Sequence, residues 1–278
     1  MLNKIPIGVF DSGYGGLTVL SELKKVLPEY DFLYLGDNAR SPYGNRSFDV
    51  VNEFTLEAVR YLFNQGCELV ILACNTASAK ALRSIQQNEL PILAPNKRVL
   101  GVIRPTSEII GDFSISKHIG ILATEGTVKS ESYLIEIGKF FPDAFVTQHS
   151  CSLWVPLIEN NMHATAGGKW FIKEDIKALL SLDPLIDTIL LGCTHFPIVS
   201  EFIQSIVGDH IRVIPQGAIV AQSLLNYLER HSAISDRCSK NGSTRYLTTE
   251  NALDFNRKAS YFLDSEIESI HISITNHT

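Results

Sequence analysis

The chain has 278 residues, of which 45% are hydrophobic and 19% charged, a balance that allows a packed core and argues against intrinsic disorder. The formal net charge is −6 at pH 7 and no block of Lys or Arg stands out, so nucleic acid is not expected as a partner. No apolar run approaches the roughly 20 residues that a membrane-spanning helix needs, and no secretion signal is visible, so we expect a cytoplasmic protein outside the membrane.

Short apolar runs alternate along the chain with segments of helical periodicity. The runs that read as buried strands are residues 5–10, 31–36, 68–73, 118–123, 187–192 and 211–215. Between them, apolar residues recur at helical spacing, as in Val51, Phe54 and Ala58. This alternation predicts an α/β fold in which mostly parallel sheets are flanked by helices.

A weak internal repeat divides the chain. The sequence IGVFDSGYGG at 7–16 resembles IGILATEGTV at 119–128, and VILACNT at 70–76 resembles ILLGCTH at 189–195. We therefore expect two pseudo-symmetric α/β domains with the active site in the cleft between them. The first domain would contain residues 1–98 and 210–278, and the second would contain residues 99–209. The segments TRYLTTEN and EIESIHISI near the C-terminus would add strands to the first domain.

Two of the five cysteines occupy matched positions in this repeat. Cys74 and Cys193 each end an apolar strand and precede a predicted helix, at the edge where open α/β sheets bind ligands. Helix N-termini offer unpaired N–H groups that favour a thiolate and can hold a carboxylate. Free cysteine is otherwise a common apolar filler, and we interpret Cys67, Cys151 and Cys238 in that way. No CxxC or close Cys/His cluster suggests zinc, so no metal site is expected.

Two thiols that face each other across a small substrate suit one reaction well. One thiol, as thiolate, removes a proton from carbon, and the other returns a proton to the opposite face, which inverts the stereocentre. The carbon acid is weak, so the site must stabilise a carbanion-like transition state. Because a free thiol with a pKa of about 8.5 is mostly protonated at neutral pH, each cysteine needs a tuning neighbour. Asp11 and His195, one from each half, are the candidates.

Several residues near these cysteines also have a purely structural interpretation. Asp11 and Ser12 precede a glycine-rich turn whose spacing fits neither the dinucleotide fingerprint nor the P-loop, so no nucleotide site is predicted. Close approach of the backbone to a small anionic ligand fits this turn better. Taken alone, residues 42–44 read as a turn, Asn75 and Thr76 as a helix cap, and Glu159 as an exposed helix end.

Five motifs in this order closely resemble those of the glutamate racemases: FDSGYGGL (10–17), GDNARSPYG (36–44), ACNTAS (73–78), LATEGTVKSESY (122–133) and GCTHFP (192–197). The resemblance runs through nearly the whole chain. It implies a cofactor-independent enzyme that interconverts L- and D-glutamate and supplies D-glutamate for peptidoglycan synthesis. It also implies a two-domain fold and a homodimer.

The resemblance assigns roles to individual residues. Cys74 and Cys193 match the two catalytic thiols, which act on opposite faces of the substrate Cα. Asp11 and His195 match residues that assist the two thiols, and Glu159 matches an acidic residue on the His195 side. The residues implied in holding the amino acid are Asp11, Ser12, Pro42, Tyr43, Gly44, Asn75, Thr76, Thr127, Thr194 and His195.

Three other functions stay open at this level. An aspartate racemase would use the same chemistry on a side chain one methylene shorter, a difference worth only about 1–3 kcal/mol in such a pocket. A non-enzymatic amino-acid-binding protein could share the fold, but it has no need of paired thiols. A thiol redox protein is disfavoured because Cys74 and Cys193 are far apart in the sequence, whereas the cysteines of such sites usually follow the CxxC spacing.

Overall fold

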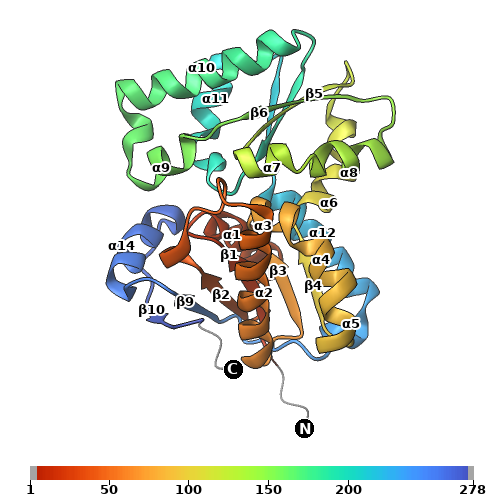
Figure 1. The fold of residues 1–278 in the computed structure, drawn as a ribbon, viewed down its shortest axis with the longest axis vertical. Coiled ribbons are helices and arrows are strands. Elements are labelled where there is room, and N and C mark those ends of the chain that lie inside the picture. The colour runs from red at the N-terminus through yellow and green to blue at the C-terminus, as the bar shows by residue number, and fades with distance from the viewer. Residues whose placement is uncertain (1–4, 275–278) are drawn as a thin grey trace.

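Two β-sheets organise the part of the chain that the structure, a computed structural model, describes, residues 5–274 (Figure 1). The first sheet contains β1 (Ile7–Asp11), β2 (Phe32–Gly36), β3 (Leu69–Leu72), β4 (Arg98–Gly101), β9 (Thr244–Thr248) and β10 (Ser269–His271). The second contains β5 (His118–Ala123), β6 (Phe145–Ser150), β7 (Thr188–Gly192) and β8 (Arg212–Pro215). We call the two halves built on these sheets the first lobe and the second lobe.

All neighbouring strands in both sheets pair in parallel. The strand order is β10-β9-β2-β1-β3-β4 in the first sheet and β6-β5-β7-β8 in the second. Every apolar run predicted as a strand overlaps one, and β9 and β10 extend the first sheet as expected. The α/β prediction is therefore confirmed. β4 and β6, which lie at sheet edges, were not predicted.

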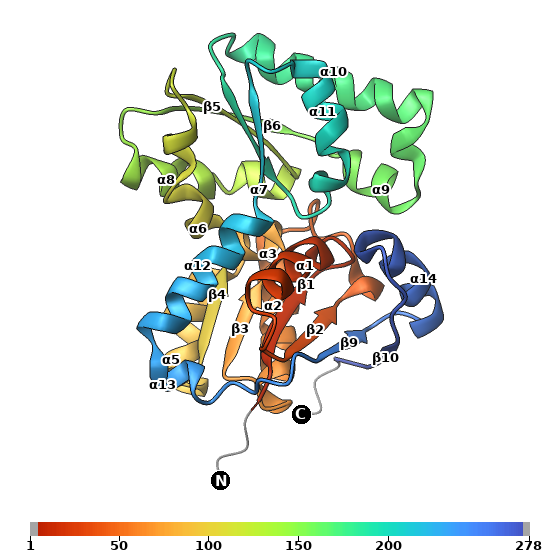
Figure 2. The same cartoon turned by 180° about the vertical axis from the view of Figure 1, so that it is seen from behind.

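Helices cover the sheets on both faces (Figures 1 and 2). Those of the first lobe are α1 (Gly16–Val26), α2 (Phe48–Asn64), α3 (Asn75–Lys80), α4 (Leu82–Ser84), α5 (Leu90–Leu93), α12 (Gly217–Arg230), α13 (Ser232–Ser235) and α14 (Ala252–Leu263). Those between β4 and β8 are α6 (Ile103–Ser107), α7 (Glu125–Lys129), α8 (Ser132–Phe140), α9 (Trp154–Glu159), α10 (Ala166–Leu182) and α11 (Ser200–Val207). Short 3₁₀ helices span 38–40, 110–113, 162–164 and 196–199, and a π-helix spans 85–89. Among residues 5–274, no helix has the length and apolar character needed to cross a membrane.

Alternation along β1 shows how the first lobe is layered. Val9 packs in the cluster that contains Leu20 of α1, and its neighbour Phe10 packs in the cluster that contains Val51 of α2. Successive residues of a strand point to opposite faces, so a strand that is apolar throughout requires helices on both sides of the sheet. Figure 2 shows α1 and α12 side by side on the face opposite α2.

The chain crosses between the lobes after β4 and again after β8. β8 pairs with β7 in the second sheet, and the following helix α12 packs on α1 of the first lobe. The expected boundary at 209/210 therefore lies too early, because it placed β8 in the first domain. β8 completes a crossover that begins at β7 and passes through α11, and such a unit returns to its own sheet. The expected boundary at 98/99 falls within β4. The division into two domains itself stays a prediction.

Candidate active site

Cys74 lies two residues after the end of β3, from which Ala73 separates it, and caps the N-terminus of α3. Its Sγ accepts a hydrogen bond from the Ala77 N–H at 3.4 Å and lies 3.4 Å from Ser12 Oγ. The residue is only 5% exposed. Burial raises the pKa of Cys74 to about 12, and the negative charge of Asp11 adds to this, against the contacts from Ser12 and Ala77. Cys74 is therefore a neutral thiol at physiological pH in this state.

Cys193 follows β7 and has a different partner. Its Sγ lies 3.9 Å from His195 Nδ1, and His195 Nε2 lies 2.9 Å from Glu159 Oε1 at the end of α9. Burial alone would lower the pKa of His195, but its contacts with Cys193 and Glu159 raise it to about 10. The imidazole is thus protonated at neutral pH, and a cation beside a sulfur atom stabilises negative charge on it. His195, and not Cys193, occupies the N-cap position of the following 3₁₀ helix, and its side chain makes no capping hydrogen bond there. The two cysteines are therefore not equivalent, although the repeat suggested that they would be.

Asp11, at the end of β1, is completely buried. Its Oδ2 accepts a hydrogen bond from the Gly13 N–H at 2.9 Å, and its Oδ1 lies 3.5 Å from Thr194 Oγ1 of the second lobe. Burial raises the pKa of Asp11, while the charge of His195 opposes this rise. The hydroxyl beside the Cys74 sulfur belongs to Ser12, so Asp11 acts on that thiol through its charge and not through a hydrogen bond.

Electrostatic coupling joins the two halves of the site. Cys193 is among the groups that raise the pKa of Cys74, and both His195 and Glu159 act on Asp11. These pairs lie in different lobes. The two strand-end cysteines, Asp11 and His195 therefore share one buried environment, and Glu159 lies half-buried beside His195.

Gly15, which precedes α1, explains how closely the lobes approach. A Cβ atom at this position would lie 2.3 Å from both His195 Nδ1 and Thr194 Oγ1. Nearby, the Thr18 hydroxyl donates to the carbonyl oxygen of Thr194 at 2.8 Å. Close approach of this turn to a small anionic ligand stays a prediction, and the approach that the structure shows is to side chains of the opposite lobe. Any side chain larger than hydrogen would displace His195.

A chain of threonine hydroxyls also crosses between the lobes. Thr76 Oγ1 lies 2.9 Å from Thr124 Oγ1, which lies 3.1 Å from Thr127 Oγ1, and all three residues are buried. The carbonyl oxygen of Gly44 accepts from the Gly126 N–H at 2.7 Å in the same region. Sequence reasoning missed Thr124, although it directly follows β5 and so obeys the strand-end rule that identified the two cysteines.

Asn75 carries a buried polar atom that needs a partner. Its Oδ1 accepts from the Tyr133 hydroxyl at 2.7 Å, but among residues 5–274 its Nδ2 has no hydrogen-bond partner. A buried unpaired donor costs about 1–3 kcal/mol, and such groups in native proteins usually mark a bound ligand or water. Asn75 is thus ready to donate to an acceptor that enters the site.

The turn at 42–44 has one exposed and one buried side chain. Pro42 is exposed. The Tyr43 ring is buried between Phe10 and Phe54, and its hydroxyl donates to Asp37. The Tyr43 side chain is therefore part of the core, and any contact of this residue with a ligand would have to come from its backbone.

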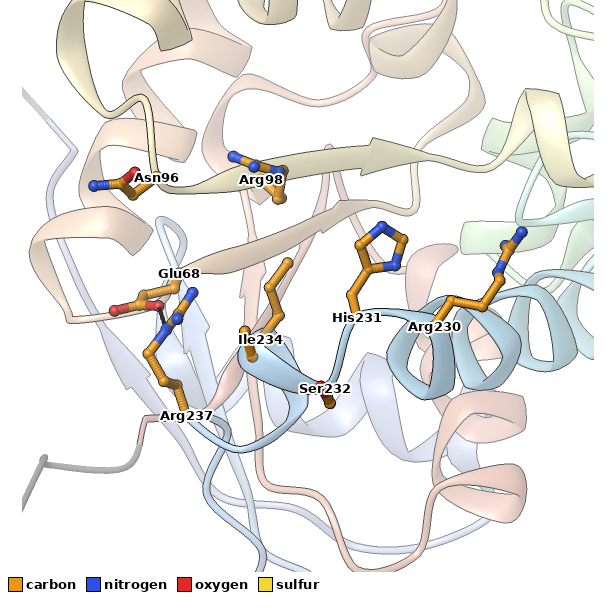
Figure 3. Close-up of a pocket in the computed structure, with 9 residues that line it drawn as sticks. Glu68, Asn96, Arg98, Arg230, His231, Ser232, Ile234 and Arg237 are labelled. Atoms are coloured by element: carbon orange, nitrogen blue, oxygen red, sulfur yellow. Dashed lines mark hydrogen bonds and ion pairs between the residues drawn. The ribbon is translucent and has the colours of Figure 1, made fainter.

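Two cavities lie away from the thiols. One, of about 590 Å³, is bordered by Arg98, Arg230 and His231, with Arg237 paired to Glu68 on its wall (Figure 3). The other, of about 610 Å³, is lined from α3, α6, α8 and α12. Within the described residues, neither cavity is lined by any of the predicted site residues. The thiols are instead enclosed, since Cys193 is only 6% exposed.

One group of side chains outside this site has the composition of a metal site. The ligand atoms of His149, Cys151 and Asp175 lie within 4.8 Å of one another. Asp175 accepts from Trp154 Nε1 at 2.6 Å and lies 2.9 Å from His149 Nε2, so its two oxygens are already paired. Because both carboxylate oxygens of Asp175 already have partners, we interpret the three side chains as a structural network and not as a metal site.

Comparison with known proteins gives one consistent answer. The family model described as Asp/Glu/Hydantoin racemase matches residues 18–224. The chain is 39% identical to the glutamate racemase of Ruegeria pomeroyi over 271 residues, covering 94% of this chain and 97% of the relative. It is 36% identical to the glutamate racemase of Levilactobacillus brevis over 275 residues, covering 98% and 96%.

Solved structures agree with this similarity. A glutamate racemase isoform from Bacillus anthracis superposes with a TM-score of 0.88 at 31% identity, covering 98% of both chains. The Francisella tularensis glutamate racemase in complex with D-glutamate gives 0.85 at 31% identity, covering 98% of this chain and 99% of that one. An aspartate racemase from Picrophilus torridus reaches only 0.52 at 17% identity, covering 84% and 99%, and so shares the fold alone.

Proposed function

This chain belongs to the Asp/Glu/Hydantoin racemase family and is an amino-acid racemase, and from that premise we propose that it interconverts L- and D-glutamate. The proton at Cα would be exchanged between Cys74 and Cys193. The observation that carries this proposal is the shared buried environment of two strand-end thiols from different lobes, each with its own tuning groups.

The protonation states support a direction for each half-reaction. Before turnover, Cys74 is a thiol with a pKa of about 12, and Cys193 lies beside a protonated His195. Cys193 as thiolate removes the Cα proton, and Cys74 gives its thiol proton to the opposite face. The product is the mirror image, and the negative charge has moved from Cys193 to Cys74. Turnover of the opposite enantiomer, or proton exchange with water, restores the starting state.

Asp11 gives a reason why Cys74 can accept that charge only with substrate present. Its carboxylate is one cause of the raised pKa of Cys74. The substrate ammonium group is a positive charge that Asp11 would pair with. Pairing offsets the repulsion between the Asp11 carboxylate and a Cys74 thiolate, so substrate binding and thiolate formation support each other.

We assign the carboxylates of the substrate to the polar groups around α3 and α7. Asn75 Nδ2 is a donor without a partner among residues 5–274, and the hydroxyls of Thr76, Thr124 and Thr127 lie in one connected chain. Ser12, Thr194 and the backbone of residues 42–44 complete the proposed binding set. Glu159 acts through His195, whose charge it holds.

Preference for glutamate over aspartate rests on similarity and needs a direct test. One methylene changes the transition-state free energy by only about 1–3 kcal/mol in a pocket of this type. Comparing kcat/KM for the two amino acids decides the matter. A higher value for aspartate would replace the present proposal with its aspartate counterpart.

The cellular role follows from the same family likeness. We propose that the enzyme acts in the cytoplasm as a homodimer and supplies D-glutamate for peptidoglycan synthesis. Light scattering on the purified protein measures the oligomeric state. Loss of D-glutamate from the precursor pool after depletion of the enzyme tests the role.

The central experiment follows optical rotation by circular dichroism, starting from L- and from D-glutamate. We expect Cys74→Ala and Cys193→Ala each to abolish racemisation, and the Cα hydrogen to exchange with deuterium from the solvent in the unmodified enzyme. Cys67→Ala is the matched control and should retain activity, because Cys67 is a buried cysteine of the hydrophobic cluster that contains Val51 of α2. Full racemisation by either site variant refutes the mechanism. Tight glutamate binding with unchanged rotation by the native protein would identify a binding protein instead.

A further inference from the structure

We propose that Tyr133 and Gln216 are positioning residues that decide which end of the Asn75 amide faces the substrate. They form a buried hydrogen-bond chain that ends on Asn75. This inference rests on the proposed function, because it takes Asn75 as a donor to a substrate carboxylate.

The three residues come from three separate places in the fold. Asn75 begins α3 of the first lobe, Tyr133 lies in α8 of the second lobe, and Gln216 lies between β8 and α12, where the chain crosses back. Their exposures are 2%, 0% and 3%. Such burial leaves the polar atoms dependent on one another, since bulk water is not an alternative partner.

The direction of the chain follows from the number of protons available. The Gln216 amide is oriented with Nε2 toward Tyr133, and since Nε2 can only donate, the Tyr133 oxygen accepts at that contact. A phenol has a single proton, and Tyr133 gives it to Asn75 Oδ1 at 2.7 Å. Burial raises the pKa of Tyr133 above its usual value, so the hydroxyl keeps this proton. The acceptor end of the Asn75 amide is therefore occupied, and its donor end, Nδ2, has no partner in the part of the chain that the structure describes.

A reversed amide would have the opposite effect on an anionic ligand. The two ends of an Asn side chain are almost the same in shape, so packing alone does not choose between them. If Nδ2 turned toward Tyr133, Oδ1 would face the substrate carboxylate and repel it. Gln216 thus acts at a distance by making Tyr133 a donor toward Asn75.

The test compares Tyr133→Phe, Gln216→Met and Gln216→Glu by steady-state racemisation of glutamate. Tyr133→Phe should raise KM about tenfold, the effect of one net hydrogen bond, with a smaller change in kcat. Gln216→Met should raise KM by less. A carboxylate only accepts, so Gln216→Glu would draw the Tyr133 proton to itself and favour the reversed Asn75 amide. We expect this variant to have the largest KM of the three.

Two double variants separate orientation from other effects. Adding Tyr133→Phe to Asn75→Ala should change KM no further, because the amide to be oriented is gone. Adding Gln216→Glu to Tyr133→Phe measures the effect of the new charge alone, and it should be smaller than in the single variant. Tyr30→Phe removes a comparable hydroxyl contact, to Ser235 outside the site, and should leave KM unchanged.

The inference is overturned if the KM increases of Tyr133→Phe and Asn75→Ala multiply in the double variant. It is also overturned if Tyr133→Phe alone leaves KM unchanged. If Tyr133→Phe does not fold, the order of KM in the two Gln216 variants decides, and equal values overturn it. The proposed function fails separately, and only if the native enzyme does not racemise glutamate.

Discussion

Replacing Glu159 by Gln removes the carboxylate that lies 2.9 Å from His195 Nε2 and keeps the shape of the side chain. A hydrogen bond to a charged group contributes about 1.5–3 kcal/mol, and a loss of about 2 kcal/mol weakens proton binding roughly 30-fold. The pKa of His195, about 10 in the native enzyme, should therefore fall to between about 8 and 9 in Glu159→Gln.

NMR titration of the imidazole signals measures this directly, with His195→Asn identifying the resonance among those of the eight histidines. The raised pKa also fixes the sign of a stability effect. The Glu159–His195 pair stabilises the fold fully below the unfolded-state pKa of about 6.5, and this contribution is lost as pH rises through about 10. The melting temperatures of native enzyme and Glu159→Gln should therefore converge above that pH. A His195 signal that titrates identically in both proteins would refute the assigned role of Glu159.

Two further substitutions test the packing around the site and the stability of the first lobe. Gly15→Ala should reduce kcat at least tenfold by displacing His195 and Thr194. The control Gly138→Ala should keep full activity, because the added Cβ on that helix would contact no neighbouring residue within 4 Å. Equal activities of the two variants would show that the close approach at Gly15 is dispensable. Burial alone would raise the pKa of Asp31, but hydrogen bonds from Ser239, Asn241 and Ser243 hold it well below its usual value. Asp31→Asn should therefore lower the free energy of unfolding, measured in urea, by about 1–3 kcal/mol at pH 7. This difference from the native protein should shrink as the pH falls below about 4 toward the lowered pKa of Asp31. The control Asp236→Asn, at an exposed site, should change the free energy of unfolding little at pH 7 or at low pH.

Central strands were predictable because they are buried on both faces. β1, β3 and β7 read as unbroken apolar runs, and the polar residues that follow them lie at one edge of each sheet. β6 escaped prediction because its sequence, FVTQHS, mixes polar residues into a partly exposed edge strand. β4, RVLG, also lies at a sheet edge, and only Val99 of this strand is buried, so it does not read as a buried apolar run.

The candidate site shows the same limit. Cys193 and Thr124 directly follow strands and Cys74 comes two residues after one, so one rule locates all three, and Thr124 was missed because that rule was applied to cysteines. Tyr133 and Gln216 follow no such rule. They lie on a helix and on a crossover, and only the packing of the two lobes brings them to Asn75.

The unequal surroundings of the two thiols have a limit that thermodynamics imposes. Mirror-image amino acids have the same free energy in an achiral solvent, so the overall equilibrium constant is one for any racemase. The ratio kcat/KM must then be identical in the two directions, whatever stands beside each sulfur. The different surroundings of the two thiols can therefore make kcat and KM differ between the enantiomers only by the same factor. This enzyme can bind one enantiomer more tightly than the other, but it cannot accumulate either one.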